Sequence, residues 1–368
     1  MHMNVGRTLA RWFPVPETLL PKSAGVDISD TSVKWITLEA SGSGYRIAAY
    51  GSERLEPGIV EQGTVRDAEA LGKALADIRG RLGATAAHAA LPEEGAYIFS
   101  MRVPRESPRE QIRNMLEFEL EGRVPLALSQ VVYDLDIIPD ASPDEQEQEV
   151  GVVAFPEELA AGYAAAFDAA GIELLSLEIE ARSIGRALWS PADSPQSDIV
   201  LMADFGRART GIAILKRGVP IFTSTVEVGG DTMMRVVMEE LSLSQTDAEE
   251  YRNKEGLLAR DSAHPATARA IEAVAASLAD EIARHYQFWD TRRGGKGERV
   301  TPIGKIVLVG GSANLKGLAD YVAGRIHAKT ERPNVWTNVC SFDEYIPPIP
   351  RRISLQYATA IGLALRGV

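Results

Sequence analysis

The sequence predicts an α/β protein built from two similar lobes. Two buried strands end in an aspartate and a tight turn, at Asp27 and Asp204, about 177 residues apart. Repeated units of this kind indicate a duplicated architecture. A third apolar run, residues 306–309, leads into Gly310 and Gly311. A glycine turn at the carboxyl end of a buried strand is where α/β folds commonly bind ligands. The chain has 368 residues, enough for two lobes of ordinary size.

Composition limits the classes of function. Apolar residues make up 45% of the chain and charged residues 24%, which is typical of a soluble globular protein. The net charge of −12 argues against nucleic acid as a partner, since nucleic acid needs a basic face. A single cysteine, Cys340, excludes an internal disulfide and suits a reducing cytoplasm. The motifs of P-loop, zincin and serine-hydrolase chemistry do not occur in the sequence.

Residues 1–23 are predicted to be an N-terminal leader. Arg7, Arg11 and Lys22 surround Leu9, Trp12 and Phe13, which suits either a short amphipathic foot on an anionic membrane or a loosely ordered segment. The leader lacks the apolar core of a signal peptide, and no apolar run of the chain reaches the ~18 residues that span a bilayer.

Residues 24–85 are predicted to form the core of the first lobe. The segment 24–40 reads as a strand pair with a polar turn at 29–32, and residues 45–50 as a third strand. Leucine and isoleucine recur at helical spacing over 67–82, which predicts an amphipathic helix.

Residues 86–170 are predicted to form an inserted α/β subdomain. Its helix over 107–124 is expected to begin with Ser107 as N-cap. The acidic stretch 139–149 is expected to be an exposed hairpin loop. The other expected elements are strands at 86–91, 97–103, 131–138 and 150–154, and a helix at 156–170 that ends at Gly171.

The rest of the chain is predicted to complete both lobes. The second lobe takes 198–230 and 300–349, and a helical subdomain takes 231–299. Residues 171–197 and 350–368 return to the first lobe, where the small-residue helix at the end of the chain is expected to pack tightly against a sheet. The second-lobe core is expected to contain strands at 199–204, 210–216 and 219–225.

Three loops together suit a nucleotide triphosphate with magnesium. Such a ligand needs carboxylates around the metal, positive charge at the phosphates and a close backbone approach. In the first loop Asp27 is assigned to the metal shell and Lys34 to the phosphates. In the second loop Asp204 is the other metal carboxylate, and Gly206 frees the backbone. The glycine loop at 310–312 is assigned to the nucleoside. Taken singly, each feature also fits an ordinary turn, and only their combination favours a binding site.

The residues in these loops resemble a known superfamily. GVDISDTSVK is similar to the first phosphate loop of the actin/Hsp70/sugar-kinase superfamily, DFGRART to its second, and VLVGGSANLKGL to its adenosine loop. The block ALPEEGAYIFSMRVP with the helix and Val-Pro-Leu junction that follow it is similar to the inserted subdomain of the PilM family of type IV pilus assembly proteins, relatives of the FtsA division proteins. The resemblance runs from about residue 24 to the end of the chain, and it implies an actin-like, ribonuclease H-like duplicated fold.

The resemblance also implies a set of site residues for ATP and Mg²⁺. It makes Asp27 and Asp204 the metal ligands, and it offers Glu178 and Glu180 as residues that orient an attacking water, although rapid hydrolysis is not expected. The nucleotide contacts that it implies are Asp27, Ser29, Thr31, Lys34, Asp204, Gly206, Thr210, Gly229, Gly230, Glu250, Lys254, Gly310, Gly311 and Ser312.

Two residues depart from the family pattern. The family has glycine where this chain has Ser29, and glycine or a small polar residue where it has Asp30. A carboxylate beside phosphates repels them unless a cation compensates. This departure leaves open a degenerate actin-like adaptor that binds no nucleotide.

The function implied by the resemblance is a cytoplasmic scaffold at the inner face of the cytoplasmic membrane. It would support type IV pilus assembly and twitching motility, and would contact the membrane through its partner. That partner is expected to be the N-terminal cytoplasmic tail of a PilN-type membrane protein, bound in a groove between the first lobe and the inserted subdomain. Self-association is left open. An FtsA-like division protein and a small-molecule kinase of the same superfamily are the alternatives. The groove is expected to be lined by Tyr97, Phe99, Met115 and Phe118.

Overall fold

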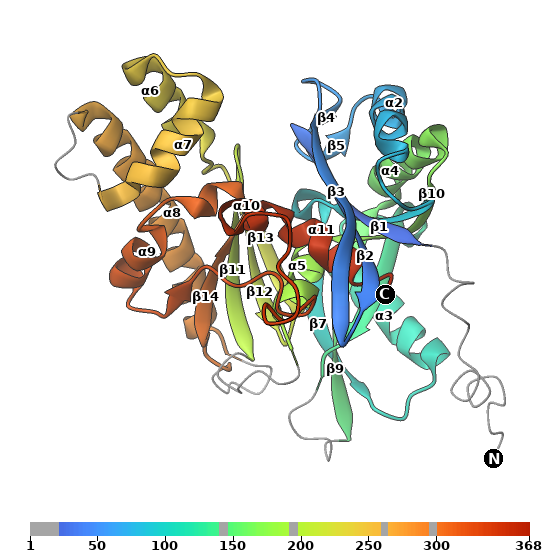
Figure 1. Cartoon of the computed structure of the whole chain (residues 1–368). Helices are drawn as coiled ribbons and strands as arrows, with labels where there is room; N and C mark the ends of the chain where they lie inside the picture. The colour runs from blue at the N-terminus through green and yellow to red at the C-terminus, as the bar shows by residue number, and fades with distance from the viewer. Residues whose placement is uncertain (1–21, 140–145, 191–197, 259–263, 294–299) are drawn as a thin grey trace.

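Two five-stranded sheets of the same design organise the molecule (Figure 1). The structure is a computed structural model. It describes residues 22–139, 146–190, 198–258, 264–293 and 300–368. Most of the expected leader therefore lies outside the described residues, as do parts of the loops expected near 139–149 and 190–198.

The first-lobe sheet is built around the strand that carries Asp27. Its spatial order is β10 (Glu173–Ile179), β6 (Ala86–Leu91), β1 (Ser23–Ser29), β2 (Ser32–Ser41) and β3 (Gly44–Arg54). Strand β1 is parallel to β6 and antiparallel to β2, and this hairpin places Asp27 directly opposite Lys34.

The second-lobe sheet repeats this design around Asp204. Its spatial order is β13 (Val219–Val226), β12 (Thr210–Lys216), β11 (Ile199–Phe205), β14 (Lys305–Val309) and β15 (Thr330–Glu331). Strand β11 is antiparallel to β12 and parallel to β14, just as β1 is to β2 and β6. The predicted duplication is therefore confirmed at the level of strand order and direction.

Helices cover the two sheets and complete each lobe. In the first lobe α2 (Ala68–Arg79) packs on α4 (Glu157–Ala170), and α5 (Glu180–Leu188) packs on α11 (Ala358–Ala364). The helical part beside the second lobe consists of α6 (Asp231–Leu241), α7 (Gln245–Glu255), α8 (Pro265–Thr291) and α9 (Leu318–Ile326). The short elements are β4 (Val60–Glu61), β5 (Thr64–Val65) and α10 (Arg351–Ser354), with single turns of tighter helix at η2 (Glu93–Gly95), η3 (Leu128–Gln130), η5 (Gly256–Leu258), η6 (Gly311–Asn314) and η7 (Leu355–Tyr357).

The inserted subdomain is a three-stranded antiparallel sheet with one helix. Its spatial order is β7 (Tyr97–Pro104), β9 (Glu147–Pro156) and β8 (Val131–Ile137), and α3 (Arg109–Arg123) covers one face. Ile112, Leu116 and Leu120 of α3 enter a small core of their own with β7 and β9. The opposite face lies on the second lobe, because a Cβ at Gly151 would stand 2.6 Å from Val219 Cγ1.

This subdomain is smaller than the sequence predicted. Strand β6 was expected to belong to it, but it lies inside the first-lobe sheet between β1 and β10. Helix α4 likewise packs on α2 of the first lobe. The predicted N-cap at Ser107 is also wrong. Pro108 has an extended backbone and takes the N-cap position, so Ser107 lies one residue too early to cap α3.

The last helix packs as closely as its small residues suggested. A Cβ on Gly25 of β1 would lie 2.1 Å from the Ala360 carbonyl oxygen, and one on Gly362 would lie 1.8 Å from the Ser183 carbonyl oxygen. Such distances are far below a van der Waals contact, so glycine is required at both positions. Helix α11 therefore holds β1 and α5 in place, and with them Asp27 near the end of β1 and Glu180 at the start of α5.

Candidate functional site

Asp27 and Asp204 face each other where the two lobes meet. Each stands near the carboxyl end of the central strand of its sheet, and Asp27 is buried at 6% exposure. Burial and, to a smaller extent, the negative charge of Asp27 raise the pKa of Asp204 to about 6. The two predicted metal carboxylates are thus close enough to repel each other, an arrangement that a divalent cation would stabilise.

Lys34 lies beside the first of these carboxylates. Its ammonium nitrogen is 3.4 Å from Asp27 Oδ2, and both side chains are largely buried. It also lowers the pKa of Asp204, although less than burial and Asp27 raise it. The predicted positive charge is therefore present at the lobe junction.

The first loop is a tight β1–β2 turn. The hydroxyl of Ser29 donates to the Ser32 carbonyl at 3.2 Å, so this side chain closes the turn itself. The Thr31 carbonyl accepts from the Leu55 amide at 3.0 Å, which ties the turn to the end of β3. Both predicted contact residues thus lie in the turn at the end of β1.

Asp30 has a different environment from the one expected. Its carboxylate accepts the amides of Gln62 at 3.2 Å and Gly63 at 2.9 Å, and it is paired with Arg209 at 2.5 Å. The concern that Asp30 would stand as an uncompensated charge against phosphates is therefore wrong in this structure, because a cation from the other lobe neutralises it.

The second loop folds against the glycine pair that opens α6. The Gly230 amide donates to the Gly206 carbonyl at 3.1 Å, and a Cβ on Gly229 would lie 2.1 Å from the Arg207 carbonyl oxygen. The buried Thr210 hydroxyl donates to the Val228 carbonyl at 2.6 Å. The structure thus brings Gly206, Thr210, Gly229 and Gly230 together around one turn.

The glycine loop after β14 approaches the same place. Gly310 has a φ of 90°, and a Cβ there would lie 2.3 Å from Asp204 Oδ1. A side chain at this position would be strained and would collide with the carboxylate. Ser312 is buried at 2% exposure, and its hydroxyl would be 2.2 Å from a Cβ on Gly230. Gly311 follows Gly310 and lies beside Gln356.

The residue of helix α7 that points toward the site is not one of the two predicted nucleotide contacts. Glu250 and Lys254 are exposed, whereas Arg252 is buried at 4% exposure and its guanidinium lies near Gly230. Burial lowers the pKa of Arg252, and Glu249 and Asp231 partly offset that effect. The expectation for Glu250 and Lys254 does not fit this geometry, since successive helix residues point about 100° apart and the inward face carries Ala248 and Arg252.

Glu180 belongs to a buried acidic group. It opens α5, and burial together with Glu93, Asp27 and Asp204 raises its pKa well above the usual range. Glu93 accepts the Ala181 amide at 2.7 Å, and its pKa is raised to about 8 by burial first and by Glu94 next. Sequence reasoning missed Glu93. Its position directly after β6 was the signal, because β6 runs parallel to β1 and ends at the same edge of the sheet.

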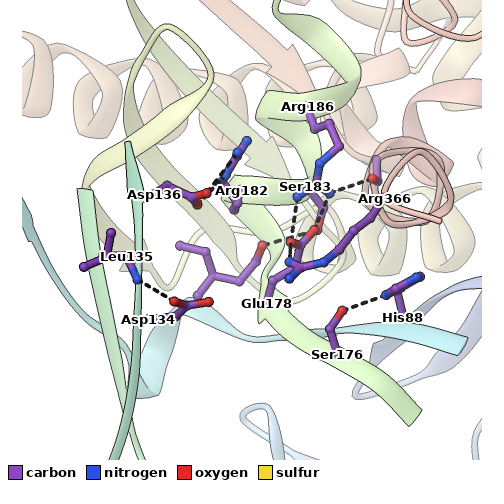
Figure 2. A network of polar contacts seen from close by, with 12 residues as sticks. His88, Asp134, Leu135, Asp136, Ser176, Glu178, Arg182, Ser183, Arg186 and Arg366 are labelled. Atoms are coloured by element: carbon purple, nitrogen blue, oxygen red, sulfur yellow. Dashed lines mark hydrogen bonds and ion pairs between the residues drawn. The ribbon is translucent and has the colours of Figure 1, made fainter. Parts of the chain in front are cut away.

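Glu178 does not join this group (Figure 2). Its carboxylate accepts from Ser183 at 2.9 Å, from Arg186 at 2.5 and 2.7 Å, and from Arg366 at 2.5 Å. These partners lower its pKa despite its burial. Both oxygens are occupied in joining β10, α5 and the end of the chain. The geometry therefore gives Glu178 a structural role and leaves Glu180 as the candidate for orienting water.

A cavity of about 570 Å³ lies apart from the lobe junction, in the inserted subdomain. Three consecutive residues of β7, Ser100, Met101 and Arg102, line one side of it. Neighbouring strand residues point to opposite faces, so a cavity that touches all three runs along the strand edge. Residues of α3 form the other wall, namely Asn114, Met115, Phe118, Glu119 and Arg123.

Two of the four predicted lining residues are in this groove, hereafter the β7–α3 groove, but it lies within the inserted subdomain and not between that subdomain and the first lobe, as predicted. Phe118 is 76% exposed, an unusual state for a large aromatic side chain, and Met115 lies one turn before it. Phe99 is buried in the small core and Tyr97 packs against that core, so these two have the ordinary packing role.

Comparison with known proteins decides the family. A family model described as type IV pilus assembly protein PilM matches residues 25–368, nearly the whole chain. The chain belongs to the PilM family. Its place among type IV pilus assembly proteins, predicted from the phosphate loops and the inserted block, is confirmed.

Solved structures of similar fold support the architecture. The PilM–PilN type IV pilus biogenesis complex has a chain with a TM-score of 0.74 at 21% identity, covering 94% of this chain and 98% of that one. The ethanolamine utilization protein EutJ from Carboxydothermus hydrogenoformans has a TM-score of 0.54 at 17% identity, covering 96% of this chain and 91% of EutJ. MreB5 of Spiroplasma citri bound to ADP has a TM-score of 0.51 at 12% identity, covering 95% of this chain and 96% of MreB5. The predicted actin-like, two-lobe fold is therefore confirmed. Among the described residues, no helix is long and apolar enough to cross a membrane.

Proposed function

We propose that this PilM-family protein is a cytoplasmic scaffold of the type IV pilus machinery that holds a magnesium nucleotide between its lobes and docks an extended peptide in the β7–α3 groove. The docked segment would be the N-terminal tail of a PilN-type inner-membrane protein, which would keep the scaffold at the inner face of the membrane. The observation that carries this function is the groove along the edge of β7, with Phe118 exposed on its far wall.

The residues at the lobe junction fit a magnesium nucleotide. Two carboxylates, Asp27 and Asp204, repel each other there, and oxygen ligands of this kind are the ones that Mg²⁺ prefers, directly or through water. Lys34 supplies positive charge next to them. The nucleoside would lie near Gly230, Ser312 and Arg252, where glycine permits a close backbone approach. Bound Mg²⁺ would neutralise the phosphates, and Glu180 would hold or orient a water.

The groove fits an extended peptide. Strand β7 is an edge of the three-stranded sheet, with β9 on its one hydrogen-bonded side among the described residues. A free strand edge can add a further strand through main-chain hydrogen bonds, while apolar anchors give the contact its specificity. Met115 and Phe118 are such anchors, and Arg102 and Arg123 place two cations on the same groove.

Peptide binding to single-residue variants tests this function. A labelled peptide with the sequence of the PilN-type tail is titrated against wild type and Phe118→Ala, and binding is followed by fluorescence anisotropy. Loss of an exposed aromatic anchor is expected to weaken binding by about 2 kcal/mol, close to thirtyfold. Phe342→Ala is the matched control, since Phe342 is also an exposed aromatic residue, at 51%, and lies outside the groove. Equal affinity in wild type and Phe118→Ala would exclude the groove as the docking site.

A further inference from the structure

Arg209 joins the two predicted phosphate loops. It stands on the β11–β12 turn of the second lobe, and its Nη2 is 2.5 Å from Oδ2 of Asp30 on the β1–β2 turn of the first lobe. Its other terminal nitrogen, Nη1, is 3.2 Å from Oε1 of Glu94 in η2. One guanidinium thus holds two carboxylates with two separate nitrogens, which is the fork geometry that suits arginine and not lysine.

The charged side chains of Arg209, Asp30 and Glu94 are largely shielded from water. The side-chain exposures are 15% for Arg209, 25% for Asp30 and 28% for Glu94. Arg209 also lowers the pKa of Glu94, which burial and the neighbouring Asp30 and Glu227 raise. Removing the cation from such a group would leave two carboxylates uncompensated, and breaking a shielded ion pair on one side is costly.

Asp30 also ties the pair to the rest of the first lobe. Its two oxygens accept the Gln62 and Gly63 amides between β4 and β5, and the Gly63 carbonyl accepts the Tyr163 hydroxyl at 2.8 Å. Arg209 therefore pairs with a carboxylate whose position is fixed by hydrogen bonds within the first lobe. The spacing between the two loops depends on this contact.

We propose that Arg209 is a positioning residue for phosphate binding: it neutralises Asp30 and Glu94 and holds the two phosphate loops at the spacing that a polyphosphate needs. This inference rests on the proposed nucleotide site and adds to it a residue that acts through its neighbours. It accounts for how a chain with aspartate in its first phosphate loop keeps that loop able to accept an anion. Without Arg209, the lobe junction would present further unpaired carboxylates to the phosphates.

Charge-removal variants test the proposal. The affinity for MgATP is measured by calorimetry for wild type, Arg209→Ala, and a triple variant with Arg209→Ala, Asp30→Asn and Glu94→Gln. Arg209→Ala is expected to bind at least about tenfold more weakly, because two carboxylates lose their counter-ion. The triple variant is expected to return to within about threefold of wild type, since the repelling charges are gone as well. A purely structural role would not be rescued by removing carboxylates.

A neighbouring arginine provides the matched control. Arg207 stands on the same turn but pairs with Asp231 of its own lobe at 3.1 Å, and both side chains are largely exposed. Arg207→Ala is expected to change the affinity by less than about twofold, as exposed pairs contribute little. If Arg209→Ala fails to fold, Arg209→Lys keeps the charge without the fork. It is expected to bind MgATP more weakly than wild type, and adding Asp30→Asn to it is expected to bring the affinity back toward that of wild type.

The outcomes separate this inference from the proposed function. A wild type that binds MgATP together with an Arg209→Ala variant of equal affinity would overturn the inference alone, as would a triple variant as weak as Arg209→Ala. A wild type that binds no MgATP would overturn the nucleotide part of the proposed function and the phosphate role with it. Thermal unfolding without ligand, in which Asp30→Asn lowers the midpoint of wild type more than that of Arg209→Ala, reports the link between the lobes independently.

Discussion

At the scale of single residues, the lobe junction is dominated by carboxylates that resist ionisation. Glu93 and Glu180 are buried, and Asp204 raises the pKa of both. Asp27 also raises the pKa of Glu180. The cations paired with the carboxylates around this junction are Lys34 and Arg209 among the described residues. A site of this kind favours a divalent cation and disfavours a bare polyphosphate, so metal and nucleotide are expected to bind together.

The raised pKa values in this acidic group predict that the free energy of unfolding falls as the pH rises. Glu93 keeps its proton in the folded state up to a pKa of about 8, whereas in the unfolded chain it loses the proton near 4.5. Between these values the folded state binds more protons, so the free energy of unfolding decreases with rising pH. Glu93→Gln keeps an oxygen for the Ala181 amide and removes the titration. Its free energy of unfolding in urea, measured from pH 5 to 8.5, is expected to fall less steeply than that of wild type.

His88 does not obscure this comparison. Its lowered pKa acts in the opposite direction just below the ordinary value of 6.5, but it is common to wild type and variant. Parallel pH profiles for the two proteins would show that Glu93 is ionised throughout this range in the folded state.

At the scale of elements, the site depends on close backbone packing behind it. Helix α11 lies so near β1 that Gly25 has no room for a side chain. Strand β1 ends two residues after Asp27, and Gly25 and Asp27 lie on the same face of the strand, so the position of this carboxylate follows from a contact made two residues earlier on that face.

Gly25→Ala is therefore expected to destabilise the protein. The added Cβ would lie 2.1 Å from the Ala360 carbonyl oxygen and 2.4 Å from the Ala364 amide nitrogen. Overpacking of this kind typically costs about 1–3 kcal/mol. Gly324→Ala in α9 is the control, because a Cβ there meets nothing within 4 Å, and it is expected to be neutral or stabilising by up to about 1 kcal/mol. Urea unfolding of the two variants checks both values, and equal stability would contradict the packing argument.

Elements with a clear period or an apolar run could be predicted from the sequence, and their pairing partners could not. The strands carrying Asp27 and Asp204 are marked by buried runs and turns, and the structure has both. Strand β6 was assigned to the wrong subdomain because a short alanine-rich strand carries no signal for the sheet that it joins. Helix α7 was predicted, but which of its faces turns inward depends on tertiary packing, and Arg252 was missed for that reason.

The ionic contacts across the lobes were beyond sequence reasoning for a similar cause. Asp30 and Arg209 are separated by 179 positions, and nothing local to either residue indicates the other. Asp30 therefore looked like an obstacle to phosphate binding. Its charge could be judged only once its partner was placed.

At the scale of the whole molecule, one arginine joins the three parts that the proposed function requires to act together. Arg182 of α5 in the first lobe makes a bidentate pair with Asp136 of β8, at 2.6 and 3.2 Å, and donates to the Gly218 carbonyl of the second lobe at 3.3 Å. Lys216 of β12 pairs with Glu149 of β9 at 2.5 Å. The inserted subdomain that carries the groove thus contacts both lobes.

The measurement that tests the account most directly is a calorimetric titration with ATP, with and without Mg²⁺, of wild type and Asp204→Asn. Wild type is expected to bind ATP only with Mg²⁺. Asp204→Asn is expected to bind at least about tenfold more weakly, a loss of about 1.4 kcal/mol or more, because the metal loses a carboxylate. The stability of the variant is expected to equal or exceed that of wild type, since burial already disfavours the ionised aspartate. A wild type that binds no MgATP would contradict the nucleotide site and leave an adaptor that works through the β7–α3 groove alone.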